Sequence, residues 1–333
     1  MREIILISND KIFLSKKKLS TDNNDTINII EAIQNGFNIF LLSNNSKNKK
    51  NFALNIKNKI TKINLKILFL LRNKKTKIFM ISITPRNILF YALIKIFIKD
   101  LEGYVFLRSN GYKEYQQKFG KFGNIFYNIM QKYAEKNLKI ISVSKKIKGS
   151  NIKFLLNPSE LNKTWFKKII KANLDFPRLL YFGRFRKEKG VYSLIDLSKK
   201  FKFNYQLTIA GDSNVNYPNN TKINFLGEIS KIKKIIELYN SHNIFILPSF
   251  TEGAPKVVLE SLARKRPVIV FKDIKHVKLN FKGVFVCGRD PISLEKCINF
   301  IIINYKKIQL SMKKNNLPTK KNFQKKLLNI LHE

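Results

Sequence analysis

The chain has 333 residues, of which 44% are hydrophobic, so it is long enough for two domains of about 150 residues with sizeable cores. Its formal net charge is +42, but the 64 Lys and Arg are spread over both halves, and no basic arm or stacking platform typical of nucleic-acid binding stands out. Two cysteines without metal-ligand spacing exclude a cysteine-based metal site and fit a reducing compartment.

Residues 1–156 are predicted to form one α/β domain. Apolar runs of strand length alternate with segments of helix length, which favours a parallel sheet covered on both faces. No signal peptide precedes the first run, so we expect a cytoplasmic protein. The expected strands are Ile4–Ile7, Ile39–Leu42, Ile78–Ile83, Val105–Leu107 and Ile140–Val143.

The segment Asn87–Ile98 is an apolar run, NILFYALIKIFI, that is too short to span a bilayer. A helix packed between the sheet and its neighbours fits this pattern, and so does a helix whose apolar face docks on a membrane surface. We favour the packed helix.

A polar stretch with Asn157-Pro158 and Pro177 predicts a linker at residues 157–177, in which Trp165 would pack at the hinge. The second domain is expected at residues 178–316. The tail, residues 317–333, has the length of a last helix.

In the second domain, a strand at Leu179–Phe182 runs into a loop that contains two cations, Arg184 and Lys189. Between a strand and a helix, such cations can converge on one diphosphate, the arginine bidentately and the lysine as a point charge. In so basic a chain, surface charges are the alternative for both. Further strands ending in turns are predicted at residues 208–212 and 223–227.

The segment 245–270, FILPSFTEGAPKVVLESLARKRPVIV, predicts a buried strand, a loop, and a helix whose first residue is Pro255. The free N–H groups at such a helix start suit a phosphate, and Gly253 allows close approach. Glu252 and Glu260 can then accept hydrogen bonds from hydroxyls at opposite ends of a nucleotide-diphosphate sugar. The alternative is a capping acid and a solvated helix residue.

The segment resembles the retaining glycosyltransferases of group 1, also called family four, which have the GT-B fold. The family combines a Pro-Ser turn, a Glu-Gly helix start, a second Glu eight positions on and a closing Pro-Val strand. The Gly183-Arg184 and Lys189-Gly190 pairs and the Gly227 turn extend the resemblance over residues 178–270. One departure is Lys265, where the family usually has Gly. The matching residues are Pro248, Ser249, Glu252, Gly253, Pro255, Glu260, Ala263, Pro267 and Val268.

The resemblance implies two Rossmann-like, doubly wound parallel-sheet domains facing a central cleft, with the last helix crossing back to the first domain. It also implies a hexosyltransferase-type enzyme that moves a sugar from a nucleotide-diphosphate donor to a hydroxyl acceptor with retention, without metal or cofactor. Arg184 and Lys189 would stabilise the departing diphosphate. Glu252 would hold the sugar and Glu260 the ribose. Donor contacts are expected from Gly183, Gly227, Gly253, Ala254, Pro255, Lys256, Val257 and Glu260.

The first half departs more from the family. No glycine follows the first strand where relatives often have a Gly-Gly turn, so acceptor phosphate binding there is unsupported. Asn110 stands where many relatives have a His near the donor sugar. An amide can bind a hydroxyl but is no general base, and Asn110-Gly111 can equally be a tight turn. Arg108, Asn110 and Tyr112 are therefore the acceptor-side candidates.

Enzymes of this family build bacterial lipopolysaccharide, capsule and other surface glycans. We accordingly expect a glycan or lipid-linked acceptor, no nucleic acid, and attraction of so basic a chain to the anionic inner face of the plasma membrane. Missing motifs count against a GT-A metal site, a nicotinamide or flavin enzyme and a serine hydrolase. The alternatives left open are a non-catalytic scaffold of the same fold, a basic membrane-surface or nucleic-acid binding protein, and a GT-B-like epimerase or phosphorylase.

Overall fold

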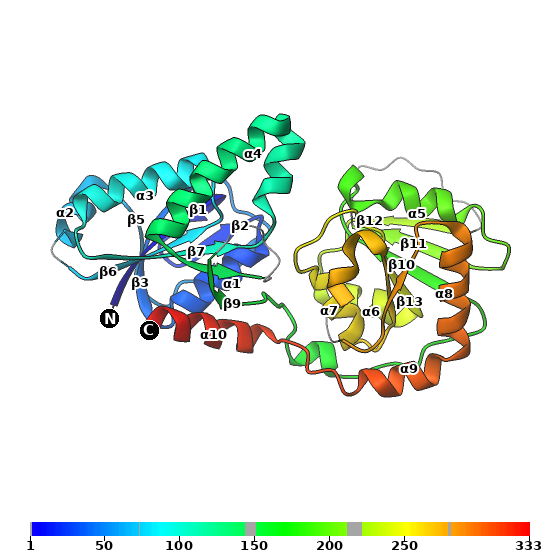
Figure 1. Cartoon of the computed structure of the whole chain (residues 1–333). Coiled ribbons are helices and arrows are strands. Elements are labelled where there is room, and N and C mark those ends of the chain that lie inside the picture. Colours follow the sequence, from blue (N-terminus) through cyan, green and yellow to red (C-terminus); the bar gives the residue numbers. More distant parts are fainter. Residues whose placement is uncertain (1, 73, 144–150, 212–221, 279–280) are drawn as a thin grey trace. The chain divides into compact units, whose positions relative to one another are not determined.

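A computed structural model describes residues 2–72, 74–143, 151–211, 222–278 and 281–333. The chain divides into two compact units (Figure 1). Unit 1 combines Met1–Glu160 with Lys320–Glu333, and unit 2 is Leu161–Thr319. Each unit is built on a mainly parallel sheet with helices on both faces, so the predicted α/β class and the two Rossmann-like domains are confirmed.

The sheet of unit 1 contains every strand expected in the first half. Ile4 to Ile7 are fully buried in β1, which pairs in parallel with β3 and β6, as apolar runs covered on both faces should. The sheet order is β4-β2-β1-β6-β7-β8-β9, and β3 and β5 continue it beside β1. The strands are β1 (Arg2–Leu14), β2 (Lys18–Thr21), β3 (Phe37–Asn45), β4 (Phe52–Asn55), β5 (Ile60–Lys62), β6 (Thr76–Ile81), β7 (Leu101–Leu107), β8 (Lys139–Ser142) and β9 (Ile152–Leu155).

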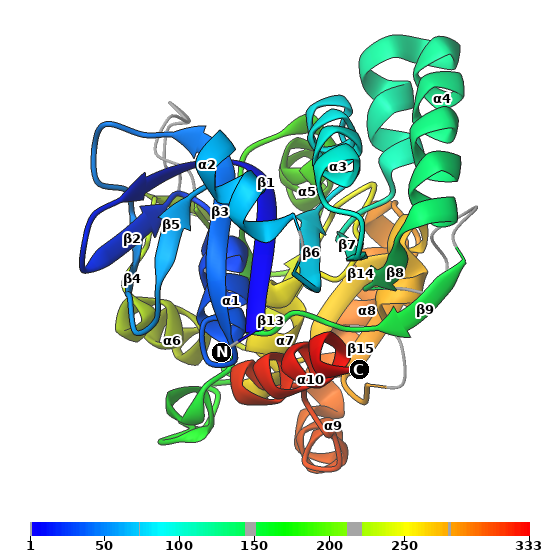
Figure 2. The same cartoon turned by 90° about the vertical axis from the view of Figure 1, so that its left-hand side faces the viewer.

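Helices cover both faces of this sheet. In both views α1 and α10 lie on one face and α2, α3 and α4 on the other (Figures 1 and 2). The last helix is therefore part of unit 1, where Phe323 and Leu327 are buried and Lys320 pairs with Glu31 at 2.6 Å. The helices are α1 (Asn24–Ile33), α2 (Leu65–Leu71), α3 (Pro85–Phe97), α4 (Gly111–Asn137) and α10 (Lys320–His332).

The predicted segment 87–98 forms most of α3. Its inner face packs Tyr91 and Ile94 in the core, while Leu89, Leu93 and Ile96 are exposed on its outer face. Within the described ranges, none of the helices has both the length and the apolar character needed to cross a membrane.

The sheet of unit 2 is parallel throughout, in the order β12-β11-β10-β13-β14-β15. Its strands are β10 (Arg178–Phe182), β11 (Gln206–Ala210), β12 (Ile223–Gly227), β13 (Ile244–Leu247), β14 (Val268–Phe271) and β15 (Val284–Cys287). Its helices are α5 (Val191–Ser198), α6 (Ile232–Ser241), α7 (Lys256–Ala263), α8 (Pro291–Ile303) and α9 (Tyr305–Met312), with short 3-10 turns η1 (Lys163–Phe166), η2 (Lys187–Lys189) and η3 (Lys272–Lys278).

Most of the segment expected as a linker is held on unit 2. Trp165 is only 3% exposed and belongs to the core of that unit. Two buried arginines fix the segment: Arg264 donates to the carbonyls of Trp165, Lys167 and Lys168, and Arg266 donates to carbonyls of the same segment and of α6. These cations are satisfied by backbone oxygens, which makes their burial tolerable.

Candidate active site

The predicted donor-side residues lie at the carboxyl edge of the unit 2 sheet. From β10 the chain winds outward through β11 and β12, whereas β13, β14 and β15 extend the sheet in the other direction. The order of strands therefore reverses between β10 and β13, which is the topological switch point at which open α/β sheets bind ligands. The loops that follow these two strands carry residues 183–190 and 248–255.

The two loops meet through an ion pair. Lys189 Nζ lies 2.7 Å from Glu252 Oε1, although the two residues are 63 positions apart. Ser249 Oγ donates to the same carboxylate oxygen at 2.7 Å, and His276 Nε2 donates to the Glu252 carbonyl at 2.9 Å. The Glu252 side chain is 10% exposed and that of Lys189 is 23% exposed, so the pair is mostly buried but still reaches the surface.

Close backbone packing holds the loops together. Gly190 has φ +67, and a Cβ on it would lie 2.1 Å from the Pro248 carbonyl oxygen. The Phe250 N–H donates to the Glu188 carbonyl at 2.9 Å. Arg289, which the sequence did not single out, donates to the Pro248 carbonyl at 2.9 Å and stacks over the Phe250 ring at 4.0 Å. No motif marks Arg289, because its partners lie about 40 residues away.

The helix after the second loop begins one residue later than predicted. Pro255 is the N-cap, with φ −70 and ψ 117, and α7 starts at Lys256. Its extended ψ excludes Pro255 from the helix. The cap makes no side-chain hydrogen bond, so none of the first-turn N–H groups of α7 is occupied by it. Gly253, Ala254 and Val257 flank this start and are partly exposed.

Glu260 lies in the second turn of α7 and is held by a buried tyrosine. Tyr239 is fully buried, and its hydroxyl donates to Glu260 Oε2 at 3.0 Å and to the Val257 carbonyl at 3.3 Å. Burial, together with the neighbouring Glu260 carboxylate, raises the pKa of Tyr239, which therefore remains a donor. The Tyr239 hydroxyl thus fixes the orientation of the Glu260 carboxylate, a contact that the sequence did not reveal.

The remaining donor-side candidates lie in the loops beside this pair. Arg184 is exposed in the loop after β10, its carbonyl accepts the Tyr181 hydroxyl at 2.8 Å, and no ion pair of its side chain is found within the described parts of the chain. Gly183 donates to the Ala210 carbonyl at 2.9 Å. Gly227 has φ +64 and accepts the Gly211 N–H at 2.7 Å.

In unit 1, the acceptor-side candidates lie just before and at the start of α4. Asn110 is its N-cap and accepts the Lys113 N–H at 3.3 Å, so it begins a helix and not the tight turn that the sequence left open. Tyr112 donates to Asn128 Oδ1 at 2.8 Å, and Arg108 Nη1 lies 3.8 Å from Asp25 Oδ2. The region without a Gly-Gly turn is continuous strand, because β1 runs on to Leu14.

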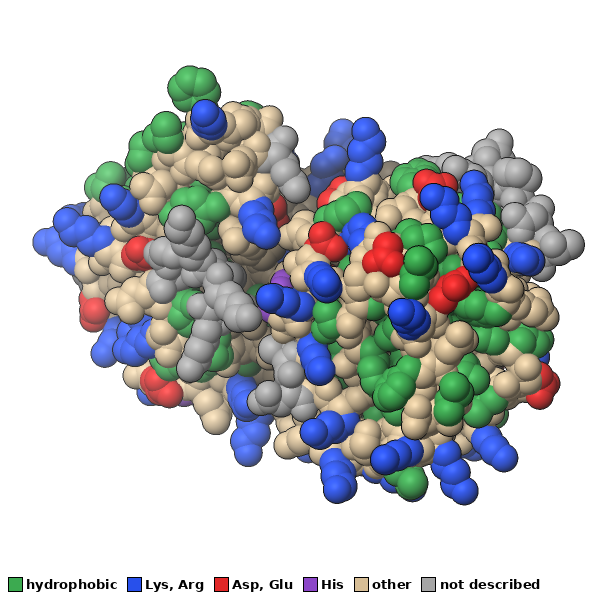
Figure 3. Space-filling view, turned by 45° about the vertical axis from the view of Figure 1, so that its right-hand side comes forward, with side chains coloured by type: hydrophobic (Ala, Val, Ile, Leu, Met, Phe, Trp, Pro, Cys, Tyr) green, Lys and Arg blue, Asp and Glu red, His purple; other side chains and the backbone are tan. Residues whose placement is uncertain are grey.

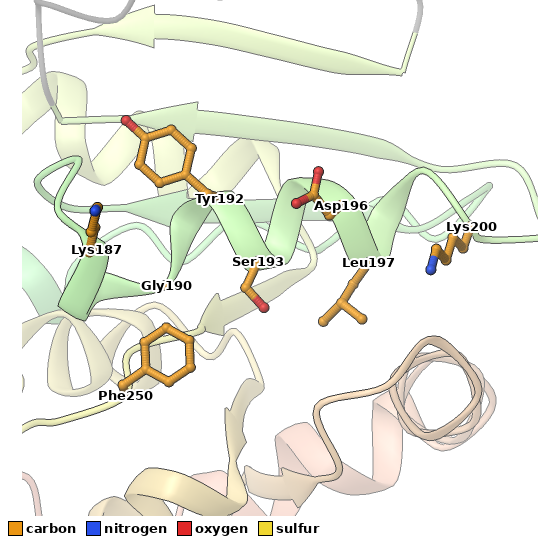
Figure 4. A pocket seen from close by; sticks show the side chains of 8 residues that line it. All are labelled: Lys187, Gly190, Tyr192, Ser193, Asp196, Leu197, Lys200 and Phe250. Carbon is orange, nitrogen blue, oxygen red and sulfur yellow. The ribbon is translucent and has the colours of Figure 1, made fainter.

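A pocket of about 410 Å³ borders the same loop. Its lining includes Lys187, Gly190 and Phe250 but neither Lys189 nor Glu252. Figure 4 shows Ser193 and Leu197 of α5 pointing to the side on which Phe250 lies. The pocket is therefore a neighbour of the ion pair rather than the space around it.

Residues 162–317 match the family model described as Glycosyl transferases group 1. A curated protein of Campylobacter jejuni is 28% identical over 167 residues, 45% of this chain and 45% of that protein; its name is GalNAc-alpha-(1->4)-GalNAc-alpha-(1->3)-diNAcBac-PP-undecaprenol alpha-1,4-N-acetyl-D-galactosaminyltransferase. The chain spans about half the length of the curated relatives it matches.

Two solved structures are similar over nearly their whole length. A sucrose-phosphate synthase from Thermosynechococcus elongatus has a TM-score of 0.71 at 14% identity, with 100% of this chain and 98% of that chain covered. Anabaena Alr3699/HepE in complex with UDP-glucose has a TM-score of 0.67 at 12% identity, with 100% of both chains covered. This similarity concerns the fold, and it confirms the predicted GT-B class.

Proposed function

Because residues 162–317 match the family model of the glycosyl transferases of group 1, we propose that the chain transfers a hexose from a nucleotide-diphosphate sugar to a hydroxyl acceptor with retention of the anomeric configuration. The observation that carries the proposal is the Lys189–Glu252 pair at 2.7 Å, located where the strand order reverses and directly ahead of α7. A cation for a diphosphate and a carboxylate for sugar hydroxyls are thereby adjacent.

In the proposed reaction, the bond between the sugar C1 and the β-phosphate oxygen breaks and its electron pair stays on the phosphate. Lys189, Arg184 and the first N–H groups of α7 stabilise that charge, which is preorganised electrostatic catalysis. The acceptor oxygen bonds to C1, and its proton passes to the leaving phosphate. The products are the glycoside and a nucleoside diphosphate, with no metal taking part.

Each glutamate binds a different part of the donor in this proposal. Glu252 accepts hydrogen bonds from the sugar hydroxyls, and Ser249 and Lys189 fix its carboxylate. Glu260 accepts from the ribose hydroxyls, and Tyr239 fixes its orientation. Glu260 is four residues beyond the start of α7, which is about 6 Å along a helix axis and suits a ligand that extends from its phosphates to its ribose.

The proposed setting is bacterial surface polysaccharide or lipopolysaccharide synthesis at the cytoplasmic face of the plasma membrane. The Campylobacter relative supports a lipid-linked acceptor, since its name specifies a glycan on PP-undecaprenol. On the acceptor side, Arg108 and Tyr112 offer polar groups beside Asn110, whose side chain already caps α4.

The test is a thermal-shift panel of UDP-, GDP- and ADP-sugars, followed by calorimetry and NMR of the product anomer. One donor class should raise the midpoint of unfolding, because a ligand that binds only the native state stabilises it by mass action. The product should keep the donor's anomeric configuration. No shift with any donor together with no transfer to any glycan or lipid-linked acceptor would overturn the proposal, and an inverted anomer would remove retention.

A further inference from the structure

Helix α4 is a hairpin of two helical segments. They meet at Gly120, whose φ of +59 and ψ of −145 are non-helical. A Cβ on Gly123 would lie 2.1 Å from the Tyr115 carbonyl oxygen, so the second segment folds back tightly against the first. The hairpin projects from the sheet, with its tip at residues 119–122 (Figures 1 and 2).

The hairpin exposes a row of large apolar side chains, here named the α4 stripe. After the tip residue Phe119, its members follow the i, i+3, i+4, i+7 spacing of one helix face. Their exposed fractions range from 47% to 81%, the highest at Phe122. The stripe consists of Phe119, Phe122, Ile125, Phe126 and Ile129.

The stripe is not needed to pack α4 on the sheet. That contact uses the opposite face of the second segment, where Tyr127, Met130 and Ala134 are at most 5% exposed. The helix therefore has two apolar faces, and the described residues of the chain cover only one of them. A contiguous exposed apolar face of this kind is typical of an interaction site.

A neighbouring helix extends the apolar face. On α3, Leu89, Leu93 and Ile96 are 45% to 76% exposed at the i, i+4, i+7 spacing. α3 and α4 touch and cover the same face of the sheet. In the space-filling view, hydrophobic side chains lie on the projecting part of unit 1 with basic side chains among them (Figure 3).

The charge of these helices, like that of the whole chain, favours an anionic partner. α2, α3 and α4 together contain eight Lys and Arg but only two Glu. Lys118 and Lys121 are exposed at the tip, and Lys132 is exposed farther along α4. A protein partner would have to match this charge with carboxylates. An anionic bilayer instead presents lipid phosphates at its surface and an apolar layer below them. The lysines of the hairpin can contact the phosphates while its aromatic rings enter the apolar layer.

We propose that the α4 stripe docks on an anionic lipid bilayer, with its aromatic tip in the boundary between headgroups and acyl chains and its lysines on lipid phosphates. The stripe lies along the surface, since it is far too short to span a bilayer. The inference deepens the proposed function by placing the enzyme beside a lipid-linked acceptor, but its test requires no sugar transfer.

The test is sedimentation of the full chain with phosphatidylglycerol–phosphatidylcholine vesicles and with pure phosphatidylcholine vesicles over a range of salt concentrations. Lysine contacts weaken as salt screens them, whereas apolar insertion persists. Replacing Phe122→Ser together with Ile125→Ser should weaken the salt-resistant binding by roughly a hundredfold, since each buried apolar side chain contributes a factor of about ten.

The matched control is Ile303→Ser with Ile292→Ser on α8 of unit 2. These side chains are 83% and 65% exposed, against 81% and 60% for Phe122 and Ile125. All four positions are exposed, so both double variants should fold, which circular dichroism and thermal unfolding check. A charge pair completes the set: Lys118→Gln with Lys121→Gln should weaken binding at low salt more than Lys306→Gln with Lys307→Gln on α9.

Equal loss in the stripe and control variants, or unchanged binding in the stripe variant, would overturn the proposal. A dimer in analytical ultracentrifugation that the stripe variant dissociates, with no vesicle binding by the wild type, would assign the stripe to a second copy of the chain instead. As a direct readout, Phe122→Trp should show a blue-shifted emission and quenching by brominated lipids when vesicles are added, and Ile303→Trp should not.

Discussion

At the scale of single residues, the candidate site is held by side chains that each serve two partners. Glu252 accepts from Lys189 and Ser249, and Tyr239 links Glu260 to the α7 backbone. A substitution at such a position removes one contact and also releases the partner. The predicted effects therefore depend on which hydrogen bonds the released partner retains.

Replacing Lys189 with Met should lower kcat/KM about a hundredfold, because a charge next to the leaving diphosphate is lost while Glu252 keeps its bond from Ser249. Lys187→Met is the matched control. It removes the same charge from the same 3-10 turn, at an exposed position outside the Lys189–Glu252 pair. Equal kinetics for the two variants would remove Lys189 from the diphosphate site.

Replacing Glu260 with Ala should abolish donor binding in calorimetry without unfolding unit 2. The buried Tyr239 hydroxyl then retains the Val257 carbonyl as an acceptor, so the cost in stability is small, about 1 kcal/mol. Tyr239→Phe is predicted to weaken binding only severalfold, since it loosens the Glu260 carboxylate without removing it. Donor affinity that is unchanged in Glu260→Ala would exclude the ribose role.

The pH dependence of unit 2 should report on His242, which burial gives a pKa of about 4, below the ordinary histidine value of 6.5. The nearby Arg178 and Arg266 also disfavour its charge, whereas its bond to the Leu238 carbonyl favours it. Since the folded pKa is the lower one, His242 contributes full stability above pH 6.5, and this is lost as pH falls toward 4, by up to about 3 kcal/mol.

The probe for this loss is Trp165, the only tryptophan, which is buried in unit 2. Urea unfolding followed by its fluorescence should show a midpoint that falls between pH 6.5 and 4. In His242→Gln, which has no ionisable ring, most of that slope should be absent. A slope equal to that of the wild type would show that other groups cause it.

The sequence predicted some of these residues and not others for a physical reason. Glu252 and Lys189 lie in loops that follow recognisable buried strands, so their shared edge of the sheet was predictable. Tyr239 and Arg289 act across 21 and about 40 positions from elements whose local pattern only indicates a helix or a turn. Lys265, the departure from the family's Gly, adopts φ +56, which explains why a glycine suits that position.

At the scale of elements, apolar strands were predictable because burial on both faces requires continuous apolar runs. β4 has no such run, since its residues are mostly exposed, and only its pairing with β2 makes it a strand. The fold-back of α4 depends on Gly120, and glycine alone does not distinguish a kink from a helix end. α7 starts at Lys256, one residue later than predicted, because Pro255 has an extended ψ.

Replacing Gly190 with Ala should displace the loop after β10. The added Cβ would lie 2.1 Å from the Pro248 carbonyl oxygen, so the two site loops must separate, and both stability and donor affinity should fall. Gly120→Ala also has positive φ but meets no atom within 4 Å. It should destabilise unit 1 through backbone strain and leave donor affinity unchanged. Wild-type donor affinity in Gly190→Ala would contradict the close packing of the loops.

At the scale of the whole molecule, each unit includes a segment that lies outside its predicted domain bounds, 1–156 and 178–316. Residues 161–177 pack on unit 2 through the carbonyls that Arg264 and Arg266 bind, and α10 returns to unit 1. The sequence predicted a linker at the first place because a polar stretch lies between Asn157-Pro158 and Pro177. The contacts that hold it come from arginines about 96 to 99 residues later, which no local pattern reveals.

The return of α10 predicts that the two units can be destabilised separately. Leu327 is fully buried against unit 1, where Phe323 also packs near Phe106 at 6.4 Å. Leu327→Ala should therefore cost unit 1 about 2–5 kcal/mol, the usual range for a large-to-small change in a core. Leu310→Ala on α9 is the control, because that side chain is 53% exposed and its truncation should cost little.

Hydrogen exchange measures the stabilities of the two units separately. In Leu327→Ala, the amides of β1 and β6 should lose protection by the full cost, while those of β13 and β14, together with the Trp165 fluorescence transition, should stay as in the wild type. Such a result requires that α10 stabilises unit 1 and does not contribute to the stability of unit 2. Loss of protection in both sheets to the same degree would mean that the chain unfolds as one cooperative body, so that a terminal helix of unit 1 also determines the stability of the proposed donor site.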